Sequence, residues 1–295
     1  MNLYPIHATV NVNGRITDAA SAVVSVFDHG FLFGEGVYET LRTYNSQPFL
    51  LERHFRRFRA SAQAISLPVP LDDAAFRTRI DKTVAAAKIS GERYIRLLLT
   101  RGVGELSYDP ASCETASLII IVKAHTECPP EVRTRGVAIT ISSVLRNHPR
   151  AINPLIKSNN LLNNALAMQE ALRRGAAEAL MRNYRGEIAE CAQANFFIVR
   201  NGTALTPPLE AGLLEGVTRN FVFEVGNEAG IPVREAVLAD ADLDGADEMF
   251  LTSTTREIFP ITRIDSRELG SGMAGPVTLA LSEAFRRKAD ALTRT

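Results

Sequence analysis

Hydrophobic positions in the first half of the chain follow either the two-residue period of strands or the 3.6-residue period of helices. Two β-rich runs, 8–12 and 22–27, flank Asn13-Gly14, which predicts a hairpin turn. Apolar residues at helical spacing predict one helix over 52–65 and another that begins at Asp72 or Asp73 and runs to about 87. Further apolar runs predict strands at 37–44, 48–51, 94–100 and 116–122.

A polar stretch with two prolines interrupts this pattern. Pro129 and Pro130 are expected to stop both helix and strand, so residues 124–136 are predicted to link a small N-terminal domain, 1–123, to a larger domain, 137–295. In the larger domain a helix is predicted over 159–174, ended by Gly175. We expect this helix to bury one stripe: Leu162, Ala165, Leu166, Gln169 and Leu172.

The rest of the chain predicts short strands followed by helices. Strands are expected at 137–144, 179–183, 187–191, 195–200, 203–206 and 248–252, and helices at 216–229 and from about 277. Asn201-Gly202 predicts another hairpin turn. Strands in runs with helices on one side indicate the α+β class, with two domains.

Composition excludes several classes of function. The 295 residues carry a formal net charge of zero, which gives no electrostatic case for nucleic acid or for an anionic membrane. We expect no secretory signal, no membrane-spanning helix and a cytoplasmic location. Three cysteines and five histidines show no spacing typical of a metal site, and the odd cysteine count argues against a closed disulfide framework.

Lysine is scarce, with five lysines against 28 arginines, so each lysine can be interpreted. Lys157 follows Asn153-Pro154-Leu155-Ile156, and no carboxylate is near it in the sequence. Loss of hydration at such a position favours the neutral amine that a Schiff base with an aldehyde requires. A lysine at an ordinary loop–helix junction is the alternative. The other four lysines are expected at the solvated surface: Lys82, Lys88, Lys123 and Lys288.

Three separate features suit a bound phosphate. One of the arginines at 53, 56, 57 and 59 could turn inward, a helix is predicted to begin at about Gly216, and residues 252–255 form a hydroxyl-rich turn. Glu190 lies between two predicted strands. Strand alternation from Ile188 places its side chain on the same, apolar side as that of Ile188. A protonated pyridine nitrogen would offset the cost of that position by about 4 kcal/mol. A surface carboxylate on a hairpin is the alternative.

Several motifs, in order along the chain, resemble those of the fold-type IV pyridoxal-phosphate enzymes. This group contains the branched-chain amino acid aminotransferases, the D-amino acid aminotransferases and the aminodeoxychorismate lyases. The resemblance runs from about Asn11 to the C-terminal helix and is carried by Phe27-Asp28-His29-Gly30, Gly34 to Glu39, His54 to Phe58, Ile156-Lys157-Ser158, Glu190 with Asn195-Phe196-Phe197, Gly216 to Arg219 and Ser253 to Ile258. It implies a small N-terminal α/β domain and a larger domain with a mixed, β-barrel-like sheet and flanking helices.

The resemblance also implies roles for individual residues. Lys157 matches the catalytic Schiff-base lysine, Glu190 the partner of the pyridine nitrogen, and Arg57 the phosphate arginine. The other implied cofactor-binding residues are Leu214, Gly216, Val217, Thr218 and Thr254. The implied substrate-binding residues are Phe33, Tyr38, Arg42, Tyr94, Arg96, Leu106, Tyr108, Thr255 and Arg256. Members of the family are homodimers or larger homo-oligomers.

The expected reaction is ping-pong transamination between an L-amino acid, either branched-chain or otherwise hydrophobic, and 2-oxoglutarate. Leu106-Ser107-Tyr108 stands where D-amino acid enzymes carry an Arg-x-His carboxylate trap, whereas Asn160-Leu161-Leu162 lacks a tyrosine that branched-chain enzymes usually have. Arg256 stands where many branched-chain enzymes have a small residue, and it could bind a second carboxylate of the substrate. The alternatives are a D-amino acid or (R)-amine aminotransferase, an aminodeoxychorismate-type lyase, and a fold relative that binds the cofactor without turnover.

Overall fold

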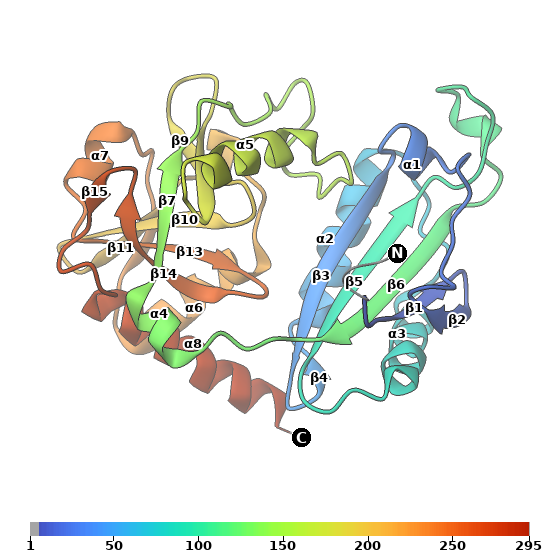
Figure 1. Cartoon of the computed structure of the whole chain (residues 1–295), viewed down its shortest axis with the longest axis horizontal. Helices are drawn as coiled ribbons and strands as arrows, with labels where there is room; N and C mark the ends of the chain where they lie inside the picture. Colours follow the sequence, from blue (N-terminus) through green and yellow to red (C-terminus); the bar gives the residue numbers. More distant parts are fainter. Residues whose placement is uncertain (1–5, 295) are drawn as a thin grey trace. The chain divides into compact units, whose positions relative to one another are not determined.

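The computed structural model describes residues 6–294, which form two compact units (Figure 1). The first unit contains the chain up to Thr126 together with Ile156–Asn160, and the second contains Glu127–Leu155 and the chain from Leu161 onward. The sequence assigned the Lys157 segment to the C-terminal domain, whereas the structure groups it with the N-terminal unit. The outermost predicted domain limits, Met1 and Thr295, lie outside the described residues.

The first unit is a six-stranded sheet in the order β2-β1-β6-β5-β3-β4, with helices packed against it. Its strands are β1 (Thr9–Val12), β2 (Arg15–Asp18), β3 (Gly36–Tyr44), β4 (Gln47–Pro48), β5 (Arg93–Thr100) and β6 (Ser117–Ala124). Its helices are α1 (His29–Leu32), α2 (Leu51–Ala64), α3 (Asp73–Ala87) and the 3₁₀ turn η1 (Pro110–Ser112). Asp72 caps α3 by accepting from the backbone N–H of Ala75, as the sequence predicts.

Strand register divides the side chains of this sheet between two faces. Val37 and Leu41 of β3 join one buried cluster with Phe55 and Phe58 of α2 and Phe76 of α3, so both helices cover the same face (Figure 1). Tyr38 and Arg42 alternate with these residues and therefore point to the opposite face. The register pairs Arg42 with Tyr94 and Thr40 with Arg96, which brings the four predicted pocket residues onto that face: Tyr38, Arg42, Tyr94 and Arg96.

The first hairpin turn is confirmed, but the predicted second strand is wrong. Asn13 and Gly14 both have positive φ angles, 52° and 97°, as a two-residue hairpin turn of type I′ requires. The returning strand is β2, which pairs Val12 with Arg15, and residues 22–27 form no strand. β2 lies at the edge of the sheet and is mostly exposed, so it carries no hydrophobic alternation for the sequence to reveal.

The second unit is a nine-stranded sheet in the order β12-β11-β10-β13-β14-β7-β8-β9, with β15 paired to β14. Its strands are β7 (Val137–Ile141), β8 (Glu178–Arg182), β9 (Ile188–Cys191), β10 (Asn195–Arg200), β11 (Thr203–Thr206), β12 (Val233–Glu235), β13 (Glu248–Ser253), β14 (Glu257–Ile264) and β15 (Arg267–Glu268). Its helices are α4 (Pro130–Arg135), α5 (Leu162–Arg173), α6 (Val217–Ala229), α7 (Asp240–Asp244), α8 (Pro276–Thr293) and the 3₁₀ turn η2 (Leu209–Ala211).

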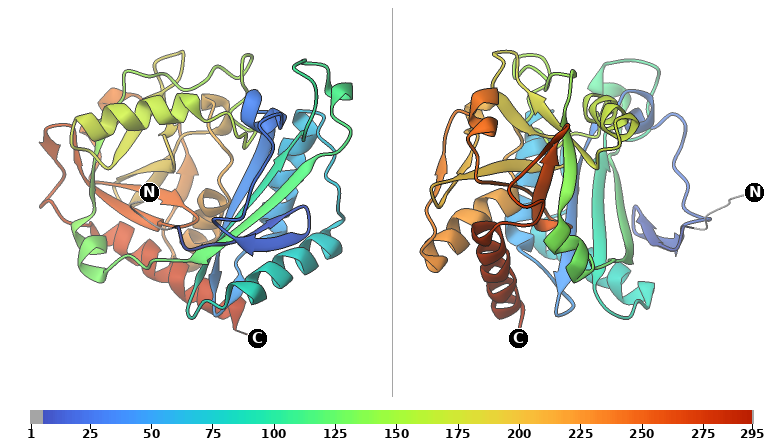
Figure 2. Two further views of the ribbon diagram at one scale, coloured as in Figure 1. Left: turned by 45° about the vertical axis from the view of Figure 1, so that its right-hand side comes forward. Right: turned by 60° about the vertical axis from the view of Figure 1, so that its left-hand side comes forward.

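This sheet curls around one apolar core. Ile139 of β7, Ile188 of β9 and Phe196 of β10 belong to a single buried cluster although their strands lie far apart in the sheet order. The other face of β13 packs against α6, which in turn packs against α8 with Phe221 edge-on to Phe285 (Figure 2). The fold is therefore α+β with a half-barrel sheet and flanking helices, as predicted.

The predicted orientation of the helix at 159–174 is wrong. The helix is α5, and none of the five residues of the predicted stripe is buried: Leu162, Ala165, Leu166, Gln169 and Leu172. Ala167 and Ala171 are fully buried and join the cluster that contains Ala179 and Met181 of β8. Small side chains let the helix approach the strand closely, so close packing outweighed the burial of larger side chains.

A short helix also replaces the break expected at the prolines. α4 begins at Pro130, where proline is tolerated because the first helical N–H needs no intrahelical partner. Within residues 6–294 the structure contains no helix long and apolar enough to cross a membrane.

Candidate active site

The segment around Lys157 extends the sheet of the first unit at the free edge of β3. The N–H of Tyr38 donates to the carbonyl of Lys157 at 2.9 Å, and the N–H of Asn159 donates to the carbonyl of Gly36 at 2.8 Å. The N–H of Lys157 donates to Ser61 Oγ on α2 at 3.1 Å. Three backbone contacts thus fix the base of the lysine side chain.

Lys157 lies on the same face of the sheet as the predicted pocket residues. Its Nζ is 4.4 Å from the centroid of the Tyr38 ring, and the Arg96 guanidinium is 4.1 Å from the same centroid. Arg42 is buried and lies over the Tyr44 ring at 4.1 Å. The structure therefore brings Lys157, Tyr38 and Arg96 into contact and places Arg42 on the same face of the sheet.

Arg57 is held by a carboxylate that the sequence analysis did not single out as part of the site. Glu39 is fully buried, and it accepts from Arg57 Nε at 2.6 Å and from Arg57 Nη2 at 2.8 Å. His54 Nδ1 lies 2.7 Å from the second oxygen of the same carboxylate. A bidentate pair of this kind fixes the orientation of a guanidinium.

The protonation states in this cluster follow from burial and charge. Burial alone would raise the pKa of the Glu39 carboxyl, but the charge of Arg57 and the hydrogen bonds from Arg57 and His54 outweigh it, so the pKa lies well below its usual range. Burial lowers the pKa of His54 more than the neighbouring Glu39 raises it, and the charges of Arg57 and Lys157 lower it further. His54 is therefore a neutral donor, and Glu39 and Arg57 form the ion pair.

The predicted loop residues of the first unit are exposed. Leu106 and Tyr108 are 70% and 81% exposed. Tyr108 contacts Phe33, with ring centroids 4.9 Å apart, and Phe33 lies edge-on to His29 at the same distance. Phe33 and Tyr108 are thus brought together, and no contact joins either of them to Lys157 among the interactions of the described residues.

In the second unit Glu190 lies in β9 and is buried, as its position in the strand suggests. Arg146 Nε donates to one carboxylate oxygen at 2.8 Å, and Asn195 Nδ2 donates to the other at 3.1 Å. The chain therefore supplies a cation for Glu190 from Arg146, a residue that the sequence did not indicate.

The helix start predicted near Gly216 is confirmed. Gly216 is the N-cap of α6, and no side chain caps the helix there. Asn195 Nδ2 donates to the carbonyl of Leu214 at 2.9 Å, and a Cβ on Gly216 would lie 1.9 Å from Asn195 Oδ1. Asn195 thus links Glu190 to the segment that opens α6, whose first residues are Val217 and Thr218.

The turn between β13 and β14 carries Thr254, Thr255 and Arg256. Arg256 Nη2 donates to Glu178 Oε2 at 2.5 Å, and Glu178 is fully buried in β8. The carboxylate that Arg256 binds in this structure therefore comes from the chain itself. The ion pair fastens the threonine turn to β8.

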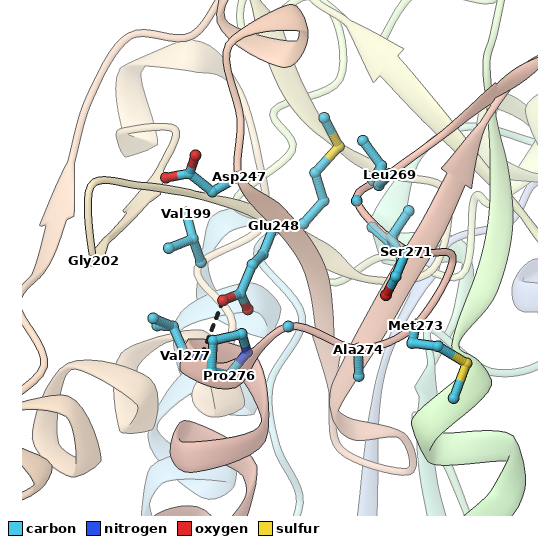
Figure 3. A pocket seen from close by; sticks show the side chains of 14 residues that line it. Val199, Gly202, Asp247, Glu248, Leu269, Ser271, Met273, Ala274, Pro276 and Val277 are labelled. Carbon is cyan, nitrogen blue, oxygen red and sulfur yellow. Dashed lines mark hydrogen bonds between the residues drawn. The ribbon is translucent and has the colours of Figure 1, made fainter.

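A cavity of about 410 Å³ lies elsewhere in the second unit, beside the start of α8 (Figure 3). Met249, Leu269 and Met273 line it, and none of the predicted site residues does. Glu248 also lines it, but its carboxylate accepts from the N–H groups of Val277 at 2.9 Å and Thr278 at 2.8 Å. These contacts explain Glu248 as a cap for α8, and we assign the cavity no role in the reaction.

The half-barrel fold, the anchored Lys157, the Arg57 that Glu39 orients and the buried Glu190 fit the class of enzyme that the motifs predict. A family model described as amino-transferase class IV matches residues 36–264, and the chain belongs to that family.

Relatives of two specificities are about equally similar to this chain. It is 37% identical over 279 residues to a putative branched-chain-amino-acid aminotransferase of Methanocaldococcus jannaschii, covering 94% of this chain and 95% of that protein. It is also 37% identical over 281 residues to the D-alanine aminotransferase of Listeria innocua, covering 94% of each. Among solved structures, the branched-chain amino acid aminotransferase of Thermobaculum terrenum in its PLP form has a TM-score of 0.86 at 29% identity, covering 96% of this chain and 94% of that chain.

Class IV aminotransferases use pyridoxal phosphate, and groups within each unit, taken separately, fit parts of this cofactor. In the second unit, Thr252 Oγ1 is buried and has no hydrogen-bond partner among the described residues, although Thr252 lies directly opposite Asn195 in the sheet. This unsatisfied hydroxyl and the uncapped start of α6 suit a phosphate. In the first unit, Lys157 supplies an anchored amine.

Sequence reasoning missed three residues that hold the predicted ones in place: Glu39, Arg146 and Glu178. Glu39 alone carries a usable signal, because it interrupts the apolar alternation of Val37 and Leu41 on the buried face of β3. Arg146 and Glu178 meet their partners only through tertiary contacts.

Proposed function

We propose that this aminotransferase transfers the amino group of a hydrophobic, branched-chain L-amino acid to 2-oxoglutarate. The observation that carries the proposal is the common face shared by Lys157, Tyr38 and Arg96. An aromatic ring provides apolar contact for a hydrocarbon side chain, and a guanidinium beside it provides a site for a carboxylate. The similarity to the putative branched-chain aminotransferase supports the same choice.

The proposed cofactor-binding residues are those that the resemblance implies. Within the first unit, Lys157 would bind the cofactor aldehyde and move the proton at the substrate α-carbon, and Arg57 would bind the phosphate in the orientation that Glu39 sets. Within the second unit, the N–H groups of Val217 and Thr218, at the helix start that Gly216 caps, and the hydroxyl of Thr254 would bind phosphate. Leu214 would pack against the ring, and Glu190 would pair with its nitrogen. Bound pyridoxal phosphate supplies the electron sink that the reaction requires.

The substrate-binding residues are proposed on the same basis. Tyr38, Arg42, Tyr94 and Arg96 would bind the amino acid on the face of the first sheet opposite to α2 and α3. Phe33, which follows α1, and Leu106 and Tyr108, in the loop at 102–109, would contact the side chain of the amino acid. Thr255 would contribute a hydroxyl, and Arg256, neutralised by Glu178, would leave its part of the pocket suited to an apolar group.

D-amino acid transamination is the second candidate, because a D-alanine aminotransferase is as similar to this chain as the branched-chain relative is. The sequence Leu106-Ser107-Tyr108 favours the L-amino acid reaction, since it offers no cationic trap for a carboxylate in this loop.

The test begins with the protein purified in pyridoxal phosphate. Wild type should show visible absorption from the bound cofactor, and Lys157→Ala should lose that band and the activity. Lys82→Ala, at an exposed lysine of the same unit, is the matched control and should keep both. L-Leucine, D-alanine and an (R)-amine are then added separately without an acceptor. Conversion by L-leucine supports the proposal, conversion mainly by D-alanine or the amine replaces it, and release of pyruvate from aminodeoxychorismate would identify a lyase.

We also propose that the chain forms a homodimer. The N–H of Gly104 donates to the carbonyl of Phe27 at 3.2 Å, so the segments 23–31 and 103–108 lie side by side. Both segments expose large apolar residues, at 49% to 81%: Val23, Val24, Val26, Phe27, Phe31, Val103, Leu106 and Tyr108. A monomer rarely exposes so many neighbouring apolar side chains. Sedimentation velocity of wild type and of Phe31→Ser tests this, and a monomeric wild type would refute it.

A further inference from the structure

The loop formed by residues 102–109 is fastened to the segment around α1 by backbone contacts. The N–H of His29 donates to the carbonyl of Gly102 at 2.8 Å, and Gly104 donates to Phe27. The loop also packs tightly on the His29 ring, because a Cβ on Gly104 would lie 3.0 Å from His29 Nε2. These contacts hold only the first part of the loop, and Leu106 and Tyr108 follow them.

The ring of His29 reaches further into the loop. The side chain is fully buried, and its Nε2 lies 2.8 Å from the carbonyl oxygen of Glu105. Its Nδ1 lies 3.1 Å from Glu35 Oε2. A carbonyl oxygen can only accept a hydrogen bond, so Nε2 must carry a proton.

The second ring nitrogen also faces an acceptor. Glu35 Oε2 accepts from Arg101 Nε at 3.1 Å, and this guanidinium stabilises the ionised carboxylate. His29 therefore bridges Glu35 and the backbone of the loop.

Other polar groups near the ring are engaged elsewhere. The oxygens of Asp28 accept from the N–H of Gly30 at 2.8 Å and from Thr100 Oγ1 at 2.9 Å. The Cys113 thiol contacts the carbonyl of Gly102 at 3.6 Å. The Phe33 ring lies at 84° to the His29 ring. Glu35, which accepts from Arg101, is thus the charged group that faces the His29 ring.

We propose that His29 is a positioning residue that holds the 102–109 loop and thereby sets the fit of the amino donor's side chain. The part that concerns the donor rests on the proposed role of Leu106 and Tyr108 in the pocket. The anchoring itself rests only on the contacts of His29 with Glu35 and Glu105.

Two substitutions separate the contact with Glu35 from the contact with the loop. His29→Gln removes the bridge, because a glutamine amide cannot donate to both partners in the geometry of the ring. Glu35→Gln instead places an amide donor beside Nδ1, so a neutral His29 with its proton on Nε2 keeps the bond to Glu105. Arg101 remains satisfied in this variant by the carbonyls of Ile65 at 2.8 Å and Ser66 at 3.3 Å. His7→Gln, at an exposed histidine, is the matched control.

The first measurement is hydrogen–deuterium exchange of the holoenzyme over residues 102–109. His29→Gln should accelerate exchange there by about tenfold, which corresponds to the loss of about one net hydrogen bond. Glu35→Gln, which keeps the bond from His29 Nε2 to Glu105, should leave exchange over residues 102–109 close to that of wild type. Wild-type exchange rates in His29→Gln would overturn the anchoring.

Donor kinetics provide the second measurement. His29→Gln should raise KM for the best amino donor about fivefold to tenfold and change kcat by less than about twofold, because the anchor acts on fit rather than on proton transfer. A fall in kcat with KM unchanged would overturn the role in donor fit. If no donor reacts with wild type, the proposed function fails, while the exchange measurement still decides whether His29 anchors the loop.

Discussion

The buried pair of Glu39 and Arg57 offers the strongest test of how this structure is held together. Glu39→Gln keeps the size of the side chain but removes the charge and one of the two acceptor oxygens. Arg57, whose side chain is only 12% exposed, then loses this charged partner within the first unit. Removing one partner of a buried ion pair costs about 3–5 kcal/mol. Since glutamine retains one acceptor, we expect the lower end of that range, about 3 kcal/mol.

The assay is denaturant unfolding of wild type and variant at pH 7, with the free energy of unfolding taken from the transition midpoint at constant slope. Asp73→Asn is the control. Asp73, at the start of α3, is the carboxylate partner of Arg59, which lies on α2 like Arg57. Those side chains are 36% and 55% exposed, and an exposed pair is worth about 0–1 kcal/mol. A Glu39→Gln cost within about 1 kcal/mol of zero would refute the argument that burial makes this pair important.

The pH dependence provides an independent check on the same pair. The folded-state pKa of Glu39 lies below its unfolded value, so the pair stabilises the protein fully above the unfolded pKa, about 4.3. As the pH falls below that value, the unfolded chain takes up a proton that the folded chain does not, and the stabilisation declines. The difference between wild type and Glu39→Gln should therefore shrink in acid, and a difference that stays constant down to about pH 3 would contradict the cited pKa direction.

Three further predictions concern the second unit and the cysteines. Glu190→Gln should lower kcat by about 10³-fold at saturating cofactor, from a charge interaction of about 4 kcal/mol, and a loss below tenfold in steady-state rates would argue against its pairing with the ring nitrogen. Gly216→Ala should weaken pyridoxal phosphate binding by about tenfold or more, because its Cβ would collide with Asn195 Oδ1, whereas Gly245→Ala, with no contact closer than 3.5 Å, should bind normally in a titration. Burial raises the pKa of the Cys191 thiol well above its usual value, so alkylation followed by mass spectrometry should label the half-buried Cys113 and Cys128 first, and equal rates would contradict this.

The sequence alone determined the features that depend on local chemistry. Asn13-Gly14 predicts its hairpin turn because both residues tolerate positive φ, and Asp72 predicts the start of α3 because its side chain can cap the first turn. Motif order along the chain identified the family, and the scarcity of lysine singled out Lys157. These inferences need only neighbours in the sequence.

Tertiary structure decided which charges meet and which face of an element is buried. Glu39 with Arg57, Arg146 with Glu190 and Glu178 with Arg256 are separated by 18, 44 and 78 positions, so no local pattern links them. The buried face of α5 was mispredicted because Ala167 and Ala171 permit a close approach to β8 that hydrophobicity alone does not reveal. A sequence records the preferences of each residue, whereas pairing across a fold depends on which strands become neighbours.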